Sequence, residues 1–200
     1  MFAFFAGLAA GLLHVFSGPD HLAAVAPLAA DTDRSWRAGL QWGFGHTAGV
    51  LVIALLLLAA KEQLPLELIA AYSERIVGVS LIAIGAWGIW GAWVRRCEDA
   101  GVRSHSHAGA SFAIGTIHGL AGSSHLFGVL PALAFSARLD SMLYLSGFGI
   151  GAIAAMSAFA AGMGLLAARI GRTRHRRYSG LLYASSAAAL VIGGFWLVGR

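Results

Sequence analysis

Side chains that could hold a metal ion occur at only a few positions in this sequence. Two histidine pairs have a spacing of seven residues, an aspartate directly precedes the second histidine of the first pair, and one histidine lies between the pairs. These candidate ligands are His14, Asp20, His21, His46, His118 and His125. Imidazole nitrogens with one carboxylate suit divalent Ni, Co, Zn or Fe, whereas monovalent copper favours sulfur ligands. The set therefore predicts a divalent transition-metal site.

Thiol chemistry is not expected from this chain. The single cysteine, Cys97, lies among charged residues at the predicted end of a helix and has no second cysteine for a disulfide or a redox pair. An enzyme is not expected either. A serine hydrolase could use Ser123 or Ser124 with a neighbouring histidine, but the sequence has no nucleophile elbow. A di-iron oxidase would need more carboxylates.

The composition indicates that lipid surrounds most of the protein. The chain has 200 residues, of which 58% are hydrophobic and 12% charged, and its mean hydropathy is +0.74. A bilayer core needs about 20 apolar residues per helix. We predict an all-α integral membrane protein without a soluble domain or a nucleic-acid partner, in which the first segment belongs to the mature protein. The six expected spans are 3–29, 37–60, 74–94, 110–135, 141–168 and 179–199.

Basic residues sort to one side of these spans. The first, third and fifth loops contain Arg34, Arg37, Arg95, Arg96, Arg103, Arg169, Arg172, Arg174, Arg176 and Arg177, and the other side has only Lys61, Arg75, Arg138 and Arg200. By the positive-inside rule, the odd loops of this cytoplasmic (inner) membrane protein lie in the cytoplasm, and both termini lie on the periplasmic or exterior side. The run Arg172–Arg177 is expected to contact anionic lipid.

The two halves of the sequence are related. At an offset of 104 positions, Gly11, His14, Gly18, His21, Pro27 and Arg34 align with Gly115, His118, Gly122, His125, Pro131 and Arg138. We therefore predict two three-helix repeats, 1–100 and 101–200, within one membrane domain. Because each repeat has an odd number of spans, the second must be inverted relative to the first, as in many alternating-access transporters.

The histidine spacing requires broken helices if each pair is to act on one ion. In a continuous helix, residues seven apart are separated by about 10.5 Å along the axis. Gly18 and Pro19 lie between His14 and His21, and Gly122 lies between the second pair. Proline lacks a backbone donor and glycine tolerates unusual dihedral angles. We therefore expect the first and fourth spans to break at these residues and to meet near the membrane midplane.

Several roles remain open from the residues alone. His46 could instead form a hydrogen bond between helices. Asp20 could bind the metal or orient a histidine ligand. His105 and His107, in a predicted cytoplasmic loop, could collect metal or simply be solvated. The histidines could also serve as proton relays for a non-metal substrate.

The residues around the first pair resemble a known family. The segment from His14 to Leu22, together with Gly43–Gly49 and Gly115–Pro131, resembles the nickel/cobalt permease superfamily, especially its small urease- and hydrogenase-accessory members. Five residues separate His14 from Asp20, as in those accessory permeases, whereas the larger permeases have four. The resemblance covers nearly the whole chain and implies that His14, Asp20 and His21 bind the metal. The additional acidic residue of the larger permeases is missing.

These observations predict a secondary transporter of a divalent metal, most simply nickel or cobalt, that works by alternating access through a histidine/aspartate site. No catalytic cofactor is expected, because the bound Ni²⁺ or Co²⁺ would be cargo. An intracellular metallochaperone is a candidate partner. Since ligation requires neutral imidazoles, coupling of transport to protons is a further hypothesis.

Overall fold

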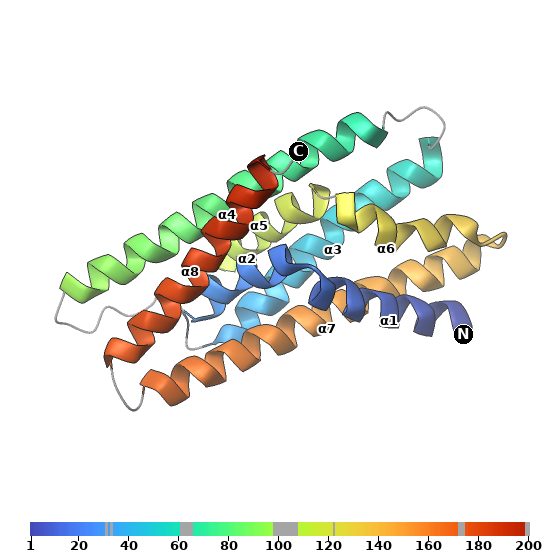
Figure 1. Cartoon of the computed structure of the whole chain (residues 1–200). Coiled ribbons are helices and arrows are strands. Elements are labelled where there is room, and N and C mark those ends of the chain that lie inside the picture. Colours follow the sequence, from blue (N-terminus) through green and yellow to red (C-terminus); the bar gives the residue numbers. More distant parts are fainter. Residues whose placement is uncertain are drawn as a thin grey trace.

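The structure, a computed structural model, describes residues 1–30, 32, 34–60, 66–97, 108–121, 123–171 and 175–198. Within these ranges the regular structure is entirely helical (Figure 1). The eight helices are α1 (Phe2–Ser17), α2 (Pro19–Ala30), α3 (Ser35–Ala60), α4 (Leu66–Cys97), α5 (Ala108–Leu120), α6 (Ser123–Ala134), α7 (Arg138–Gly171) and α8 (His175–Val198).

Four helices are individually long and apolar enough to cross a membrane. The spans are Ser35–Leu56, Glu74–Val94, Arg138–Ile170 and Gly180–Val198, and α1 with α2 forms a fifth if the bent pair is one span. Several apolar helices of this length indicate a multi-pass membrane protein. The expected six spans are not confirmed. The expected span 110–135 is divided into α5 and α6, as the predicted break requires; they have 13 and 12 residues, each extends about 20 Å, and neither alone is long enough to cross a membrane.

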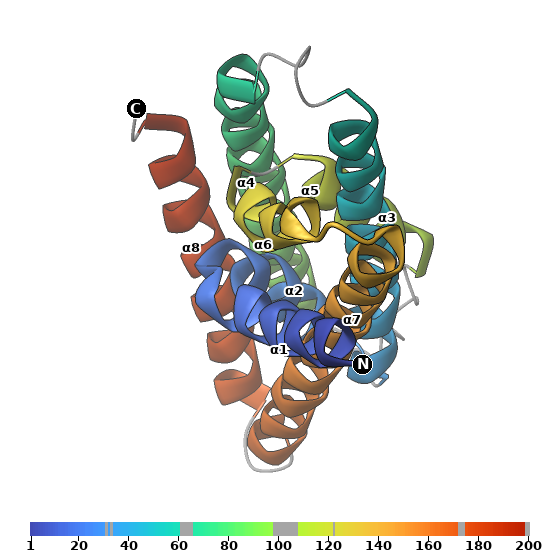
Figure 2. The same cartoon turned by 90° about the vertical axis from the view of Figure 1, so that its right-hand side faces the viewer.

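The helices pack in pairs that join the first part of the chain to the second. Helix α1 lies along α7, α5 lies along α3, and α4 lies along α8 (Figures 1 and 2). The paired helices α4 and α8 run in opposite directions, as do α3 and α7, which also contact each other. The short helix α2 contacts α8, α7, α3 and α4. Residues from distant parts of the sequence are thereby brought to the interior.

Glycines allow the backbones of α1 and α7 to come very close. A Cβ added at Gly7 would overlap the carbonyl oxygen of Tyr144, and one added at Gly147 would overlap that of Phe4. Gly11 likewise abuts the α7 backbone. Such pairs of glycines four residues apart are a common device of membrane helix packing.

The crossing of α3 and α5 is built in the same way. Gly45 and Gly49 of α3 face the backbone of α5, and Gly115 and Gly119 of α5 face the backbone of α3. A Cβ at Gly119 would overlap the carbonyl oxygen of His46. Because His46 and His118 are next to these glycines, this crossing fixes the distance between the two histidine-bearing helices.

Side chains of α7 support the short helix α6. The Ser141 hydroxyl donates a hydrogen bond to the carbonyl oxygen of Ala132 at 2.7 Å, and the Tyr144 hydroxyl donates to that of Gly128 at 3.0 Å. Pro131, inside α6, has no backbone donor of its own. Carbonyl groups near a proline and at a helix end need such partners in a membrane, since lipid offers none.

Candidate metal centre

The helix of the first span is interrupted between His14 and His21, where the sequence predicted a break. Helices α1 and α2 meet at an angle of 74°. Gly18 closes α1 by donating its backbone N–H to the carbonyl oxygen of His14 at 3.1 Å, and α2 then begins at Pro19. Proline is well suited to the first position of a helix, where its missing donor costs nothing.

The reason for glycine at position 18 differs from the one expected. Gly18 has a φ of −93° and a ψ of 99°, an extended conformation that most residues can adopt. What it provides is space. A Cβ added at Gly18 would overlap the Nδ1 atom of His21 and would come within 2.9 Å of an oxygen of Asp20. Glycine is therefore required here because two side chains of the site occupy the place of its own.

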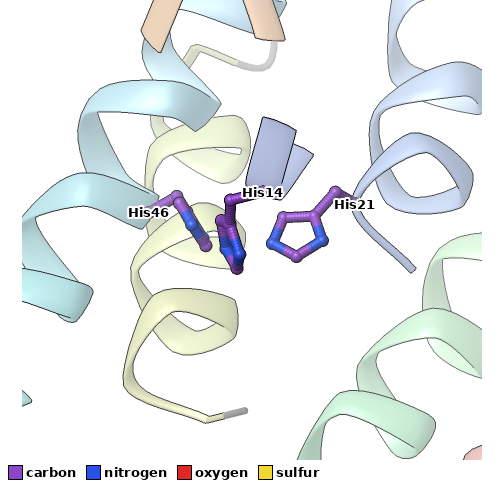
Figure 3. Close-up of side chains that lie close together, drawn as sticks. All are labelled: His14, His21 and His46. Atoms are coloured by element: carbon purple, nitrogen blue, oxygen red, sulfur yellow. The ribbon is translucent and has the colours of Figure 1, made fainter. Parts of the chain in front are cut away.

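The break brings the first histidine pair together. The ring centroids of His14 and His21 are 4.6 Å apart and the rings are nearly perpendicular, at 80°. His46 of α3 completes a group in which the His21 and His46 centroids are 4.9 Å apart. The side chains come from three helices, α1, α2 and α3, and their rings lie close together (Figure 3).

This first group, which we call the three-histidine group (His14, His21 and His46), has the dimensions of a metal site. One ligand atom from each residue lies within 4.8 Å of the other two. Four ligands around a tetrahedral ion at about 2.1 Å lie about 3.4 Å apart, so an inward movement of roughly an ångström would close the group on an ion. His21 and His46 are fully buried and His14 is half-buried.

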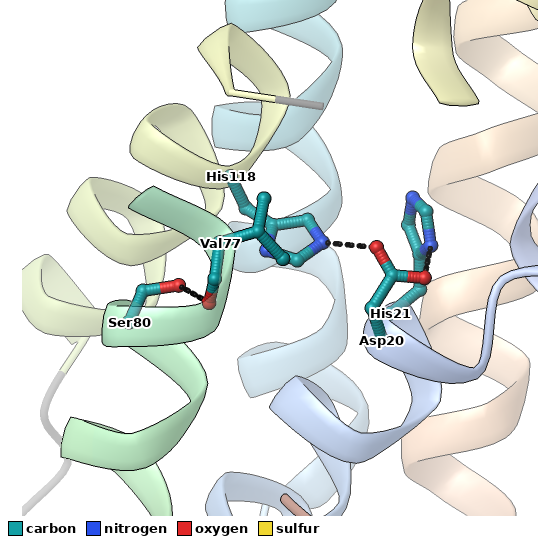
Figure 4. Close-up of polar contacts among 5 residues, drawn as sticks. All are labelled: Asp20, His21, Val77, Ser80 and His118. Atoms are coloured by element: carbon teal, nitrogen blue, oxygen red, sulfur yellow. Dashed lines mark hydrogen bonds and ion pairs between the residues drawn. The ribbon is translucent and has the colours of Figure 1, made fainter. Parts of the chain in front are cut away.

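A second group, the aspartate group, consists of Asp20, His21 and His118. The Oδ1 atom of Asp20 lies 3.0 Å from Nδ1 of His21, and its Oδ2 atom lies 3.1 Å from Nε2 of His118 (Figure 4). The three potential ligand atoms again lie within 4.8 Å of one another. All three residues are buried, and Asp20 is only 2% exposed. One carboxylate therefore contacts two imidazoles, one from α2 and one from α5.

The electrostatic setting of both groups favours a cation. His14 lies in the last turn of α1 and His118 in the last turn of α5. Carbonyl dipoles make the C-terminal end of a helix partly negative. A buried carboxylate adds a full negative charge, which is stable in such surroundings only when positive charge or hydrogen-bond donors compensate it.

Aromatic rings that were not predicted as site residues surround the histidines. Trp42, fully buried, stacks on His46 with 5.1 Å between centroids and 9° between planes, and it lies 5.2 Å from the His118 ring. Phe148 of α7 lies 5.3 Å from the His14 ring. Trp42 precedes His46 by one helical turn, a spacing that places both on one face of α3. That spacing is the signal that could have identified it.

The other predicted site residues lie partly outside the described structure. His125 belongs to α6, but its side chain is outside the described part. Gly122, His105 and His107 are outside the described residues, as are the side chains of Arg172–Arg177. Ile150, which is 104 positions after His46, is 51% exposed and offers no ligand atom, so His46 has no counterpart at that offset.

A large hollow elsewhere on the protein is separate from these groups. It has a volume of about 540 Å³ and lies between α4 and α5, lined almost entirely by apolar side chains such as Ile76, Val79, Trp87 and Ile114. None of the histidines named above lines it. It is therefore not a polar route to the histidines.

Comparisons with known proteins give a limited relationship. No family model matches the chain, and no solved structure matches it. A stretch of 129 residues is 29% identical to UreH of Bacillus sp. (strain TB-90) and covers 57% of this chain and 55% of UreH. The chain is similar to a urease accessory protein.

Two chloroplast proteins of Arabidopsis thaliana are also similar. FOR GROWTH AND FERTILITY 2 is 40% identical over 127 residues, which are 57% of this chain and 34% of that protein. FOR GROWTH AND FERTILITY 1 is 47% identical over 85 residues, which are 42% of this chain and 23% of that protein. The matched regions thus span between about a quarter and about half of the length of these curated relatives.

Proposed function

We propose that the protein is a secondary transporter that moves a divalent transition metal, nickel or cobalt, across the cytoplasmic membrane by alternating access. The observation that carries this proposal is the three-histidine group. Three imidazoles from three helices converge in the interior of a membrane protein, two of them on either side of the break between α1 and α2. Ionisable side chains at such places are expensive to bury, and they usually mark a substrate pathway.

The similarity to UreH supports nickel as cargo, because urease is a nickel enzyme and UreH is named as its accessory protein. The resemblance of the His14–Leu22 segment to the nickel/cobalt permeases points the same way. Nitrogen ligands accept several divalent ions, so nickel and cobalt are chosen here on the similarity and not on the geometry.

An inverted repeat would supply the alternating movement. In its favour, α1 packs on α7 as α5 packs on α3, and both crossings use glycines four residues apart. Related helices also run in opposite directions: α3 opposes α7, and α4 opposes α8 (Figure 1). Rocking of one repeat against the other around a shared site is the usual mechanism of such folds.

The placement of described arginines supports a cytoplasmic position for the odd loops. Arg37, in the first turn of α3, and Arg169, in the last turn of α7, lie at one end of the bundle (Figure 1). Arg138 begins α7 at the opposite end, and Arg75 lies toward the start of α4 at that same opposite end. More arginines belong to the first end in sequence, which by the positive-inside rule would face the cytoplasm. A metallochaperone would then receive or deliver the metal there.

The test is metal uptake into proteoliposomes that contain a metal-sensitive dye. Wild-type protein should transport Ni²⁺ or Co²⁺ and bind it at equilibrium. Loss of an orienting partner of a ligand typically lowers metal affinity 10–100-fold. His46→Ala removes a ligand itself, so we expect a loss of about 100-fold or more, with uptake abolished.

Ile150→Ala is the matched control, because Ile150 is the repeat counterpart of His46 and is 51% exposed. It should bind and transport as the wild type does. If the wild-type protein binds no divalent metal but carries another solute in a way that depends on these histidines, the proton-relay alternative replaces the metal proposal. If it hydrolyses or oxidises a substrate instead, transport is the wrong class of function.

A further inference from the structure

We propose that the transported ion occupies two overlapping stations that share His21. The first station is the three-histidine group and the second is the aspartate group. This inference rests on the proposed function and adds to it a path: the ion passes from one ring nitrogen of His21 to the other.

The geometry shows His21 in both groups. Figure 3 shows one ring nitrogen of His21 pointing toward His14 and His46 and the other pointing away from them. The nitrogen that meets Asp20 is Nδ1, at 3.0 Å from the carboxylate oxygen (Figure 4). Each group by itself offers three ligand atoms within 4.8 Å of one another.

The two groups cannot form a single site with all five residues as ligands. The two nitrogens of an imidazole point in divergent directions, so one ion cannot bind both. An ion bound through the nitrogen facing His14 and His46 is therefore on the opposite side of the ring from Asp20. The groups are alternatives for one ion, and three ligands in each leave a coordination position open for water or for the next ligand.

Passage between the stations conserves protons. With the ion in the three-histidine group, Nδ1–H of His21 and Nε2–H of His118 both donate hydrogen bonds to Asp20. With the ion in the aspartate group, those same two nitrogens and an Asp20 oxygen become the ligands, and each ring carries its one proton on its other nitrogen. Each ring keeps a single proton throughout, and only its tautomer changes. The carboxylate changes from hydrogen-bond acceptor to ligand.

The stations also differ in the part of the chain that supplies them. The three-histidine group comes from α1, α2 and α3, whereas the aspartate group adds His118 from α5. Any movement that changes the distance between Asp20 and His118 would act on the aspartate group, because only that group contains His118. The Asp20–His118 contact is thus the place where a movement of the halves would act on the ion.

The test separates binding from transport in full-length protein. His118→Gln retains an amide that can donate a hydrogen bond to Asp20 but is a poor metal ligand. We expect this variant to bind Co²⁺ with an affinity within about threefold of wild type while its uptake into proteoliposomes falls at least 10-fold. His46→Ala removes only the first station. It should keep residual Co²⁺ binding through the aspartate group, with an oxygen ligand visible by X-ray absorption at the metal.

Each outcome decides the question. If His118→Gln weakens binding as strongly as His46→Ala does, the residues form one site and the two-station path is wrong. If His118→Gln transports at the wild-type rate, the second station is not used and the path is also wrong. If wild-type protein neither binds nor transports metal, the proposed function itself fails. Thermal unfolding of both variants identifies any loss that is caused by misfolding, and His118→Asn replaces His118→Gln if that variant does not fold.

Discussion

The Oδ2 atom of Asp20 lies 3.1 Å from Nε2 of His118, although the two residues are 98 positions apart in the sequence. The other oxygen of the same carboxylate meets His21 at 3.0 Å. A single buried carboxylate thus holds two imidazoles, one on α2 and one on α5. This shared contact has direct consequences for variants of the site.

Replacing Asp20 with asparagine should weaken metal binding. Asp20→Asn retains the size of the side chain but removes its charge and one of its two acceptor oxygens. We expect the affinity for Ni²⁺ to fall about 10–100-fold, measured by isothermal titration calorimetry. Asp140→Asn, in the first turn of α7 and distant from the site, is the control and should bind normally. Unchanged affinity in Asp20→Asn would show that the carboxylate neither binds the metal nor orients its histidine ligands.

A methyl group at position 18 should damage the site without removing a ligand. In Gly18→Ala the added Cβ would overlap the His21 ring and crowd Asp20. We expect Ni²⁺ affinity to fall by about 10-fold or more, the size of effect seen when a ligand is badly oriented. Gly162→Ala is the matched control, since a Cβ there meets nothing within 4 Å. Equal Ni²⁺ affinities in the two variants would show that the site does not depend on the missing side chain at position 18.

Removing the indole of Trp42 should loosen His46. Trp42→Ala deletes a fully buried ring, for which the usual cost is about 3–5 kcal/mol of stability. Trp42→Phe keeps an aromatic face against His46 and should lose much less stability. The Co²⁺ absorption spectrum should change in Trp42→Ala and remain near wild type in Trp42→Phe. Identical spectra for all three proteins would mean that the stack does not position His46.

The crossing of α3 and α5 should not tolerate a larger residue. Gly119→Leu would force the side chain into the carbonyl group of His46 and separate the two helices. Overpacking of this kind typically costs about 1–3 kcal/mol, and backbone contact should place this variant at the upper end. Thermal unfolding in detergent measures the loss. Gly194→Leu, whose added Cβ meets nothing within 4 Å, should unfold at nearly the wild-type temperature.

The break between His14 and His21 could be predicted because it depends on local chemistry. Proline and glycine limit the helix wherever they occur, and a spacing of seven residues is too long for one ion in a continuous helix. The role of Gly18 could not be predicted in the same way. It depends on where the His21 ring and Asp20 lie after the bend, and so on their side-chain positions.

The number of membrane spans shows a similar limit. Apolar composition located the helices α3, α4, α7 and α8, and the break expected in 110–135 lies between the short helices α5 and α6. Hydropathy measures how apolar a segment is, and it does not show whether two short helices together cross the bilayer.

The sequence by itself determined that His14, Asp20, His21, His46 and His118 are buried polar residues in apolar helices, and that their chemistry suits a divalent metal. Only the tertiary structure decided how they are grouped. The close packing of α3 on α5 and the bend between α1 and α2 bring the His46 and His118 rings to 4.9 Å and 5.1 Å from the His21 ring. Residues 98 positions apart meet because glycines remove the side chains that would otherwise keep their helices apart, and such contacts depend on the whole packed bundle.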